Sequence, residues 1–402
     1  MNNSKIDGVY RSTARRHLLI EGWRGINHSI AMVNQHQILA LLRTGVMDLY
    51  HRDLPFFMPH WNTQNNGAGF KDEDARRIAA LIDLPDEDAD FCFRISSPVP
   101  APRVSRAKTV TFMVTEFGLE KSSFMAPTTS MSDYTRDEDL VVTPSRWSRD
   151  RLLDFGLDEA GVRVVPHGVD HLVFFPLEQE ERTVLRKNLG IEPDVIVFLN
   201  VGAPIWNKGI DLLLLAFAQV HQKTPRTRLV IKDGAQLYGI GFQSILKQFV
   251  ENHPSLVSQS LIESISVVSG NITQGQLAQL YGVCDCYVTP YRAEGFNLPA
   301  LEALACGKPI IVSSGGATDD FCHGAAVSRV PSAFRRGPLG GHAAACWVEP
   351  YVPALVELMV EAVARGPIYP NLQTAAWEQT QSFSWDRVTK SLMELYGNDS
   401  KC

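Results

Sequence analysis

Two glutamates, Glu294 and Glu302, are the residues of this 402-residue chain whose types and spacing most directly indicate chemistry. They stand eight positions apart within residues 291–314, YRAEGFNLPALEALACGKPIIVSS. The pattern predicts a loop that carries Glu294, then a helix that opens at about Leu298 with Pro299 in its first turn, where proline is tolerated. Glu302 then lies about one turn inside the helix, so both carboxylates can face one cleft and bind hydroxyl groups.

The expected amino end of that helix also indicates an anion site. Free backbone N–H groups and the positive end of the helix dipole attract negative charge there, and Gly295 lets the backbone approach a ligand closely. Amides for a phosphate and carboxylates for hydroxyl groups suit a phosphorylated sugar. The alternative is a capped core helix with two solvated glutamates.

This stretch resembles the retaining glycosyltransferases of family 4, which have the GT-B fold. The match is to their E-x7-E signature in its full context, E-G-F-x-L-P-x-x-E-A-x-A-x-G-x-P-I/V-V. Other segments are also similar to the family: DLVVTPSRW at 139–147, RVVPHGVD at 163–170, NVGAPIWNKGID at 200–211 and FSW at 383–385. The resemblance covers about residues 139–398 and is weaker before them.

The resemblance implies roles for residues at matching positions. Glu294 would hydrogen-bond the hydroxyl groups of the donor sugar, and Glu302 would bind the ribose of the nucleotide. Lys208 would act as a point charge that stabilises the departing diphosphate, which makes Lys208 and Glu294 the candidate catalytic residues. The backbone that holds the donor would come from Gly202, Gly295, Phe296, Asn297 and Leu298.

The N-terminal half carries weaker candidates. Gly22 and Gly25 bound a turn that would approach the donor phosphates from the other domain, or would be an ordinary strand-to-helix turn. A lone G-x-x-G is not the dinucleotide fingerprint, which needs G-x-G-x-x-G. His28, with His60 and Trp61, either lines an acceptor pocket or packs structurally.

The chain departs from the family at two positions. Ala203 follows Gly202 where the family usually has an arginine that binds phosphate, so one cation stands where two are expected. Compensating cations could come from Arg24, Arg292 or Lys232. Glu116 stands where the family often has a histidine after a strand of the first domain, and it is a candidate acceptor contact.

Short β-branched runs alternate with helical periodicity, which is typical of βαβ units and parallel sheets. Strands are expected at 18–21, 110–114, 140–143, 162–166, 195–201, 228–232, 265–269, 286–290, 309–313 and 345–348. Helices are expected at 29–42, 210–221, 274–283 and 298–306, and after Ser384. The resemblance implies an α/β protein of the GT-B class, with two Rossmann-like doubly wound domains that face a cleft. The two are an acceptor domain at 1–170 and a nucleotide-sugar domain at 171–376. A terminal helix at 377–402 crosses back to the first domain.

The composition excludes several classes of protein. With 45% hydrophobic residues and 38 Lys+Arg against 44 Asp+Glu, the chain is typical of a globular protein and lacks the basic footprint of nucleic-acid binding. No apolar run predicts a transmembrane helix, and the first residues lack the apolar core of a signal peptide, so we expect a cytoplasmic protein. The seven cysteines form no C-x-x-C and are expected to be free thiols. No D-x-D set stands in a nucleotide-binding context, so we expect no catalytic metal, as the resemblance also implies, and no cofactor besides the donor.

We expect a retaining hexosyltransferase that uses a nucleoside-diphosphate sugar, UDP- or GDP-linked, and a glycan or lipid-linked saccharide acceptor. Transfer would be metal-independent, by front-face displacement, and a lipid-linked acceptor would bring peripheral membrane association. The alternatives are a GT-B sugar-nucleotide epimerase, a phosphorylase, and a catalytically silent GT-B subunit that binds a nucleotide or a partner enzyme. The sequence assigns neither the oligomeric state nor the identity of donor and acceptor.

Overall fold

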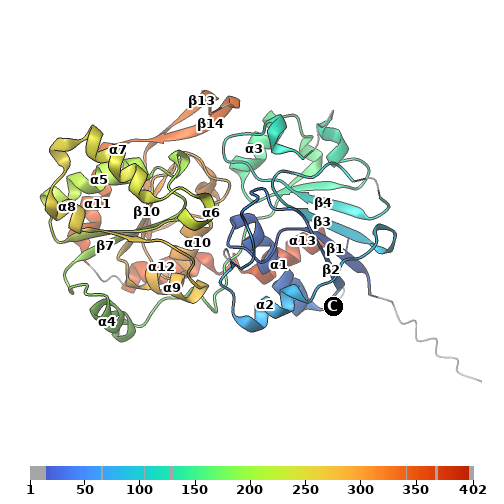
Figure 1. Ribbon diagram of the computed structural model, residues 1–402, viewed down its shortest axis with the longest axis horizontal. Helices are drawn as coiled ribbons and strands as arrows, with labels where there is room; N and C mark the ends of the chain where they lie inside the picture. The colour runs from blue at the N-terminus through green and yellow to red at the C-terminus, as the bar shows by residue number, and fades with distance from the viewer. Residues whose placement is uncertain are drawn as a thin grey trace, which may run out of the picture.

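The computed structural model describes residues 15–64, 67–103, 105–125, 130–340, 342–366 and 370–397, and they form two α/β domains (Figure 1). Each domain is built on a six-stranded sheet, and all strand pairings within the two sheets are parallel. The strand order is β2-β1-β3-β4-β5-β6 in the first sheet and β12-β11-β10-β7-β8-β9 in the second. In both sheets the order reverses beside an early strand, as in doubly wound folds.

The first sheet lies in the N-terminal domain, drawn in blue and cyan in Figure 1. Its strands are β1 (His17–Gly22), β2 (Asp48–Asp53), β3 (Phe91–Ile95), β4 (Lys108–Phe112), β5 (Leu140–Thr143) and β6 (Val162–Val164). Its helices are α1 (Ser29–Thr44), α2 (Asp72–Ala79) and α3 (Arg146–Asp154). The strand β3 is buried at every position, because helices and loops cover both faces of the sheet.

The second sheet forms the core of the C-terminal domain. Its strands are β7 (Ile196–Val201), β8 (Thr227–Lys232), β9 (Ile265–Val268), β10 (Cys286–Thr289), β11 (Ile310–Ser313) and β12 (Val327–Val330). Its helices are α4 (Gln179–Asn188), α5 (Ile210–Lys223), α6 (Ala235–Tyr238), α7 (Phe242–Asn252), α8 (Gln259–Glu263), α9 (Gln274–Val283), α10 (Leu298–Ala305), α11 (Val352–Arg365) and α12 (Pro370–Thr380). The near-continuous apolar sequence of β7, IVFLNV, matches a parallel strand that is covered on both faces.

The last helix, α13 (Trp385–Glu394), packs on the N-terminal domain, as expected for a helix that crosses back. Ser384 caps it, and Trp385 stacks on the ring of His36 in α1 at 4.9 Å between ring centroids. The hydroxyl of Tyr396 donates to the carbonyl of Cys92 at 2.8 Å. These contacts bury the apolar side of α13 in the core of the first domain.

One strand prediction was wrong in its placement. Residues 345–348 belong to β14 (His342–Pro350), which pairs antiparallel with β13 (Ser332–Leu339) and forms a two-stranded sheet of its own. The edge beside β11 is taken by β12, which the sequence analysis did not find. In Figure 1 the hairpin β13–β14 projects from the C-terminal domain toward α3.

Among the described residues, none of the helices has the combination of length and apolar character needed to cross a bilayer.

Candidate functional site

The central feature between the two domains is an ion triad of Glu116, Lys208 and Glu294. The Lys208 Nζ lies 2.7 Å from Glu116 Oε1 and 2.8 Å from Glu294 Oε2. Asn207 Nδ2 donates to the second oxygen of Glu116 at 2.7 Å. Glu116 follows β4 in the first domain, whereas the other residues follow β7 and β10 in the second. The carboxyl ends of strands from both sheets therefore meet at one lysine, the place where open α/β sheets bind ligands.

The charges of the triad do not balance. Burial raises the pKa of Glu294 to about 7, with Lys208 opposing that shift and Glu116 adding to it. The two carboxylates raise the pKa of Lys208 above its usual range despite the opposing effect of burial, which keeps the lysine protonated. One protonated lysine thus faces two carboxyl groups, and Glu294 is the one whose pKa is raised.

Two loops of the second domain lock together to place Lys208. Gly209 has a φ of 66°, and a Cβ there would lie 1.9 Å from the carbonyl oxygen of Pro290, so the site requires glycine. The backbone N–H groups of Arg292 and Ala293 donate to the carbonyl of Asn207 at 2.7 and 3.2 Å. The loop after β7 is therefore fixed against the loop that carries Glu294.

The amino end of α10 is capped and pressed against the first domain. Asn297 is the N-cap with a φ of 77°, and its side chain accepts from the N–H of Ala300. A Cβ on Gly295 would lie 2.3 Å from Cγ2 of Val114, and the Gly295 carbonyl accepts from the Ser145 hydroxyl at 2.6 Å. The close neighbour of Gly295 in this structure is thus the first domain.

The other two donor-binding candidates at this helix are packing residues here. Phe296 is buried, with its ring 4.6 Å from that of Phe321 and 4.9 Å from that of His167. Leu298 is half-buried and packs against the cores of both domains. Their backbone amides remain candidates for donor binding, while their side chains join the domains.

Glu302 lies one turn inside α10, as predicted. Its Oε2 accepts from the hydroxyl of Tyr281 at 2.9 Å, and burial raises its pKa to about 7. Burial raises the pKa of the Tyr287 hydroxyl, and Glu294 and Glu302 both add to that shift, so both carboxylates lie near this tyrosine. That the two glutamates share one cleft stays a prediction.

Gly202 lies beside Lys208 with room around it. The nearest atom to a Cβ built on Gly202 is Cγ of Lys208, at 4.0 Å. The N–H of Gly202 donates to the carbonyl of Lys232 at 3.0 Å, which ties the loop to the end of β8. This glycine leaves space next to the cation of the triad.

The three cations that could compensate for the missing arginine are all engaged elsewhere. Arg24 and Arg292 donate to Asp53 and Asp211, each at 2.8 Å. Lys232 donates to the carbonyl of the following residue at 2.5 Å, and burial lowers its pKa. Of these four cations, Lys208 is the one that pairs with Glu116 and Glu294.

The glycines of the first domain serve packing. A Cβ on Gly22 would lie 2.4 Å from the carbonyl oxygen of Ile95, and one on Gly25 would lie 2.6 Å from Cγ2 of Thr63. Gly25 also has a φ of 81°, which favours glycine. The structure therefore gives both glycines the structural role that the sequence left open.

His28 caps α1. Its Nδ1 accepts from the N–H of Ile30 at 3.2 Å, and burial lowers its pKa to about 4, so the ring is neutral at pH 7. Its ring packs 5.0 Å from that of Trp61, whose Nε1 donates across the domains to the carbonyl of Leu237 at 2.7 Å. These contacts match the structural alternative for His28 and make Trp61 an interdomain contact.

Four residues of the site were not singled out by the sequence analysis: Asn207, Gly209, Tyr238 and Tyr281. Asn207 and Gly209 flank Lys208 in the segment N-K-G, so their position beside a candidate catalytic lysine could have identified them as site residues. Tyr238 has its pKa raised to about 12 by burial, with electrostatic effects from all three members of the triad. Only the tertiary structure brings the tyrosines to the glutamates.

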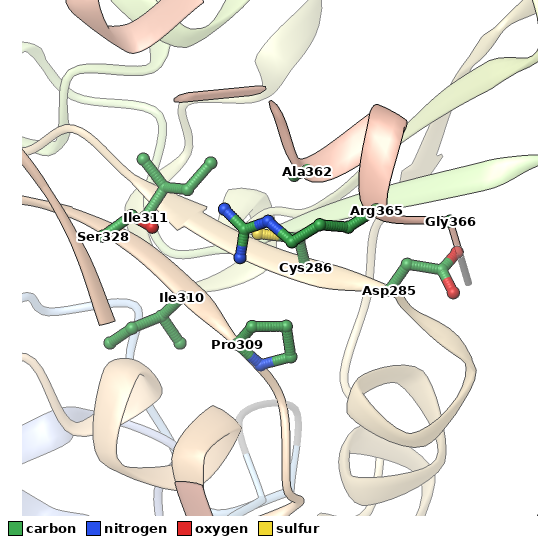
Figure 2. Close-up of a pocket in the computed structure, with 9 residues that line it drawn as sticks. All are labelled: Asp285, Cys286, Pro309, Ile310, Ile311, Ser328, Ala362, Arg365 and Gly366. Carbon is green, nitrogen blue, oxygen red and sulfur yellow. The ribbon is translucent and has the colours of Figure 1, made fainter. Parts of the chain in front are cut away.

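A separate pocket lies at the opposite edge of the second sheet (Figure 2). It is lined by the start of β10 at Asp285 and Cys286, the start of β11 at Pro309, and the end of α11 at Arg365. Burial raises the pKa of the Cys286 thiol well above its usual range, so this thiol is unreactive. The six described cysteines are free and buried, as expected, and no cluster suited to hold a metal occurs in the described ranges.

Comparison with known sequences finds a family model and relatives that each match part of the chain. Residues 181–326 match the family model of the glycosyl transferases group 1. D-inositol 3-phosphate glycosyltransferase of Actinosynnema mirum is 32% identical over 253 residues, 60% of this chain and 53% of that protein. Mannosylfructose-phosphate synthase of Agrobacterium fabrum is 31% identical over 182 residues, 45% of this chain and 39% of that protein. The chain thus spans about half the length, or less, of these relatives.

Solved structures share the fold over nearly the whole chain. A glycosyltransferase from Rickettsia africae aligns with a TM-score of 0.68 at 14% identity, covering 96% of this chain and 100% of that one. HepE from Anabaena, in complex with UDP-glucose, aligns with a TM-score of 0.66 at 15% identity, covering 95% and 99%. Sucrose-phosphate synthase from Thermosynechococcus elongatus aligns with a TM-score of 0.63 at 17% identity, covering 95% and 98%. The two-domain GT-B arrangement is therefore common to all four chains.

Proposed function

Because residues 181–326 match the glycosyl transferases group 1 and the chain has the GT-B fold, we propose that it transfers a hexose from a nucleoside-diphosphate sugar to a saccharide hydroxyl. The observation that carries this proposal is Lys208, held between Glu116 and Glu294 where the strand ends of the two sheets meet. A lysine between two carboxylates, beside the free space at Gly202, fits the diphosphate of such a donor.

We assign the residues to the donor as follows. Lys208 neutralises the departing diphosphate, Glu294 accepts hydrogen bonds from the sugar hydroxyls, and Glu302 accepts them from the ribose. Backbone amides at the start of α10 complete the phosphate site. The segment 171–376 binds the donor and 1–170 the acceptor, while 377–402 holds the two together. HepE binds UDP-glucose, which makes UDP the first donor nucleotide to test.

The proposed reaction retains the configuration at C1 and proceeds on one face of the sugar. The bond from C1 to the diphosphate oxygen breaks as the acceptor oxygen bonds to C1, and the acceptor proton passes to the departing phosphate. Lys208 stabilises the charge that grows on that phosphate, which is the largest electrostatic demand of the step. No enzymic nucleophile and no metal are needed in this scheme.

Thermal unfolding with UDP, GDP, ADP and CMP, with and without EDTA, tests the proposal. A ligand at 100 times its dissociation constant stabilises a protein by about 2.7 kcal/mol, which gives a measurable shift in Tm. We expect one nucleoside diphosphate to raise the Tm equally in EDTA, and the matching nucleotide sugar to be consumed only with a saccharide present. Consumption without an acceptor would indicate an epimerase.

The second candidate is a catalytically silent GT-B subunit. Ala203 in place of the family's phosphate-binding arginine favours it, because Arg24 and Arg292 are held by other partners. A nucleotide-induced Tm shift without turnover of any nucleotide sugar would select this candidate. If no nucleotide shifted the Tm, the result would contradict the donor site that both candidate functions require.

A further inference from the structure

A partly exposed aromatic cluster lies directly beside the ion triad. It consists of Phe117, Trp206, His342 and Trp347, and we call it the aromatic platform. The ring of Trp206 lies 6.2 Å from that of Phe117 with an interplanar angle of 26°, and 6.0 Å from that of Trp347, edge-on. Phe117 also contacts His342 at 5.8 Å. Phe117 directly follows Glu116, and Trp206 stands two residues before Lys208.

The platform is fixed in place by groups beneath and beside it. The guanidinium of Arg292 lies 4.5 Å from the centre of the Trp206 ring, and two carboxylates hold that guanidinium. The N–H of Cys346 in β14 donates to the carbonyl of Phe117 at 2.8 Å, so the hairpin is bonded to the first domain. Trp206 nevertheless remains 41% exposed. A large ring that is exposed yet immobilised is ready to bind a ligand without further ordering.

The charges around the platform do not favour an anion. Arg292, the cation under Trp206, is paired with Asp211 at 2.8 Å and with Glu349 at 3.0 Å. His342 Nδ1 lies 2.7 Å from the carboxylate of Glu120. The guanidinium that touches the platform is therefore neutralised by two carboxylates.

Aromatic faces of this kind stack on the C–H face of a pyranose ring, because the electron-rich ring attracts the weakly positive hydrogens. We propose that the aromatic platform is the acceptor subsite and that it binds a neutral pyranose ring by stacking. The hairpin β13–β14 thereby supplies part of the acceptor site from the C-terminal domain. This inference rests on the proposed glycosyl transfer, since the platform borders the residues assigned to the donor.

The same hairpin provides a matched control. Phe334 in β13 is 52% exposed, so it resembles Trp206 in exposure. Its ring lies 6.1 Å from that of Trp147 in α3 and 5.8 Å from the guanidinium of Arg151, and so belongs to a different contact between the hairpin and the first domain. Truncating Phe334 tests the hairpin without touching the platform.

The test measures saccharide binding to the full chain saturated with UDP. Isothermal titration or saturation-transfer NMR would use methyl α-D-glucopyranoside, maltose and lactose as neutral probes and glucose 6-phosphate as the charged one. For Trp347→Ala and Trp206→Ala we expect the Kd of the neutral saccharide that binds to rise about tenfold, the scale of one aromatic contact. Trp206→Phe should restore part of the affinity, and Phe334→Ala should leave it unchanged.

The UDP-induced Tm shift, measured on every variant, separates the two proposals. Failure of wild-type protein to bind any nucleotide would overturn the proposed function. If UDP binds normally, equal saccharide affinity in wild type and Trp347→Ala would overturn the platform. Preference for glucose 6-phosphate, or no binding of any neutral probe, would overturn it as well. A UDP shift that is retained in Trp347→Ala shows that this variant is folded.

Discussion

Two glycine loops that follow parallel strands occupy equivalent places in the two domains, yet they contain glycine for different reasons. Gly22 ends β1, where a Cβ would lie 2.4 Å from the Ile95 carbonyl oxygen. Gly202 follows β7, where the nearest atom to a Cβ is 4.0 Å away. At Gly22 the place of a side chain is occupied by the backbone of β3. At Gly202 that place is open and lies beside Lys208. A glycine after a strand is therefore no evidence of a ligand until its neighbours are known.

The cations of the two loops differ in the same way. Arg24 is bound by Asp53 and by the carbonyls of Ile78 and Leu81, all contacts within the first domain. Lys208 is shared by carboxylates from both domains in a site that remains partly exposed. Arg24 thus stabilises the fold of the first domain. Lys208 joins the two domains, and in the proposed function it binds the anionic diphosphate.

The largest expected effect is on catalysis, at Lys208. For Lys208→Ala we expect the turnover of the nucleotide sugar to fall by about 10²–10³-fold, as when a donor to a developing negative charge is removed. Steady-state release of the nucleoside diphosphate measures this. Lys247→Ala, at a side chain that is 79% exposed on α7, is the matched control and should keep full activity. Equal activity in both variants would remove Lys208 from the reaction.

The next effect is on stability, at Gly22. Gly22→Ala must displace the backbone of β3, so we expect a loss of about 2–4 kcal/mol in the free energy of unfolding. Denaturant unfolding followed by circular dichroism measures the loss. An unchanged midpoint would show that the first loop is as open as the second.

The third effect is a pH dependence that resides in Glu302. Its pKa is raised to about 7 by burial, so the ionised form that accepts ribose hydrogen bonds develops as the pH rises through that value. We expect nucleotide affinity to increase up to about tenfold between pH 6 and pH 8, following the ionised fraction. In Glu302→Gln this part of the increase should vanish. Titration calorimetry of both proteins at the two pH values gives the comparison, and parallel profiles would contradict the assignment.

The smallest effect is expected at Gly202. Gly202→Ala has room for its methyl group, so the unfolding midpoint should stay within about 0.5 kcal/mol of wild type. The methyl group would occupy space beside Lys208, so nucleotide affinity should weaken by a few fold. This is the reverse of the result expected at Gly22. A large loss of stability at Gly202 would erase the contrast between the loops.

The sequence predicted best the elements that depend on short, local residue patterns. The apolar strands of the second sheet and the helix that carries Glu302 follow from short patterns of the chain. The strand β2, DLYHRD, lies at a sheet edge with several partly exposed positions, so no apolar run marked it. In the hairpin β13–β14, residues 345–348 were predicted as a strand but placed in the parallel sheet. The strand β13 was missed because its arginines, glycine and proline form no clear strand pattern.

The pairing of Glu116 with Lys208 was beyond sequence reasoning for a different reason. The two residues are 92 positions apart and lie on different domains, so only domain packing brings them together. The same holds for Gly295 and Val114, whose contact gives that glycine a packing role. Sequence patterns identified the candidate site residues on each domain. Which residues they contact across the interface depends on how the two domains pack together.

The most direct test of the account is the nucleotide-induced Tm shift of wild type and Lys208→Ala, measured in EDTA. If Lys208 is the cation that binds the diphosphate, one nucleoside diphosphate will raise the Tm of the wild type by a few degrees. The variant will lose most of that shift while unfolding cooperatively. An equal shift in both proteins would contradict the assignment of Lys208, and no shift in the wild type would contradict the donor site itself.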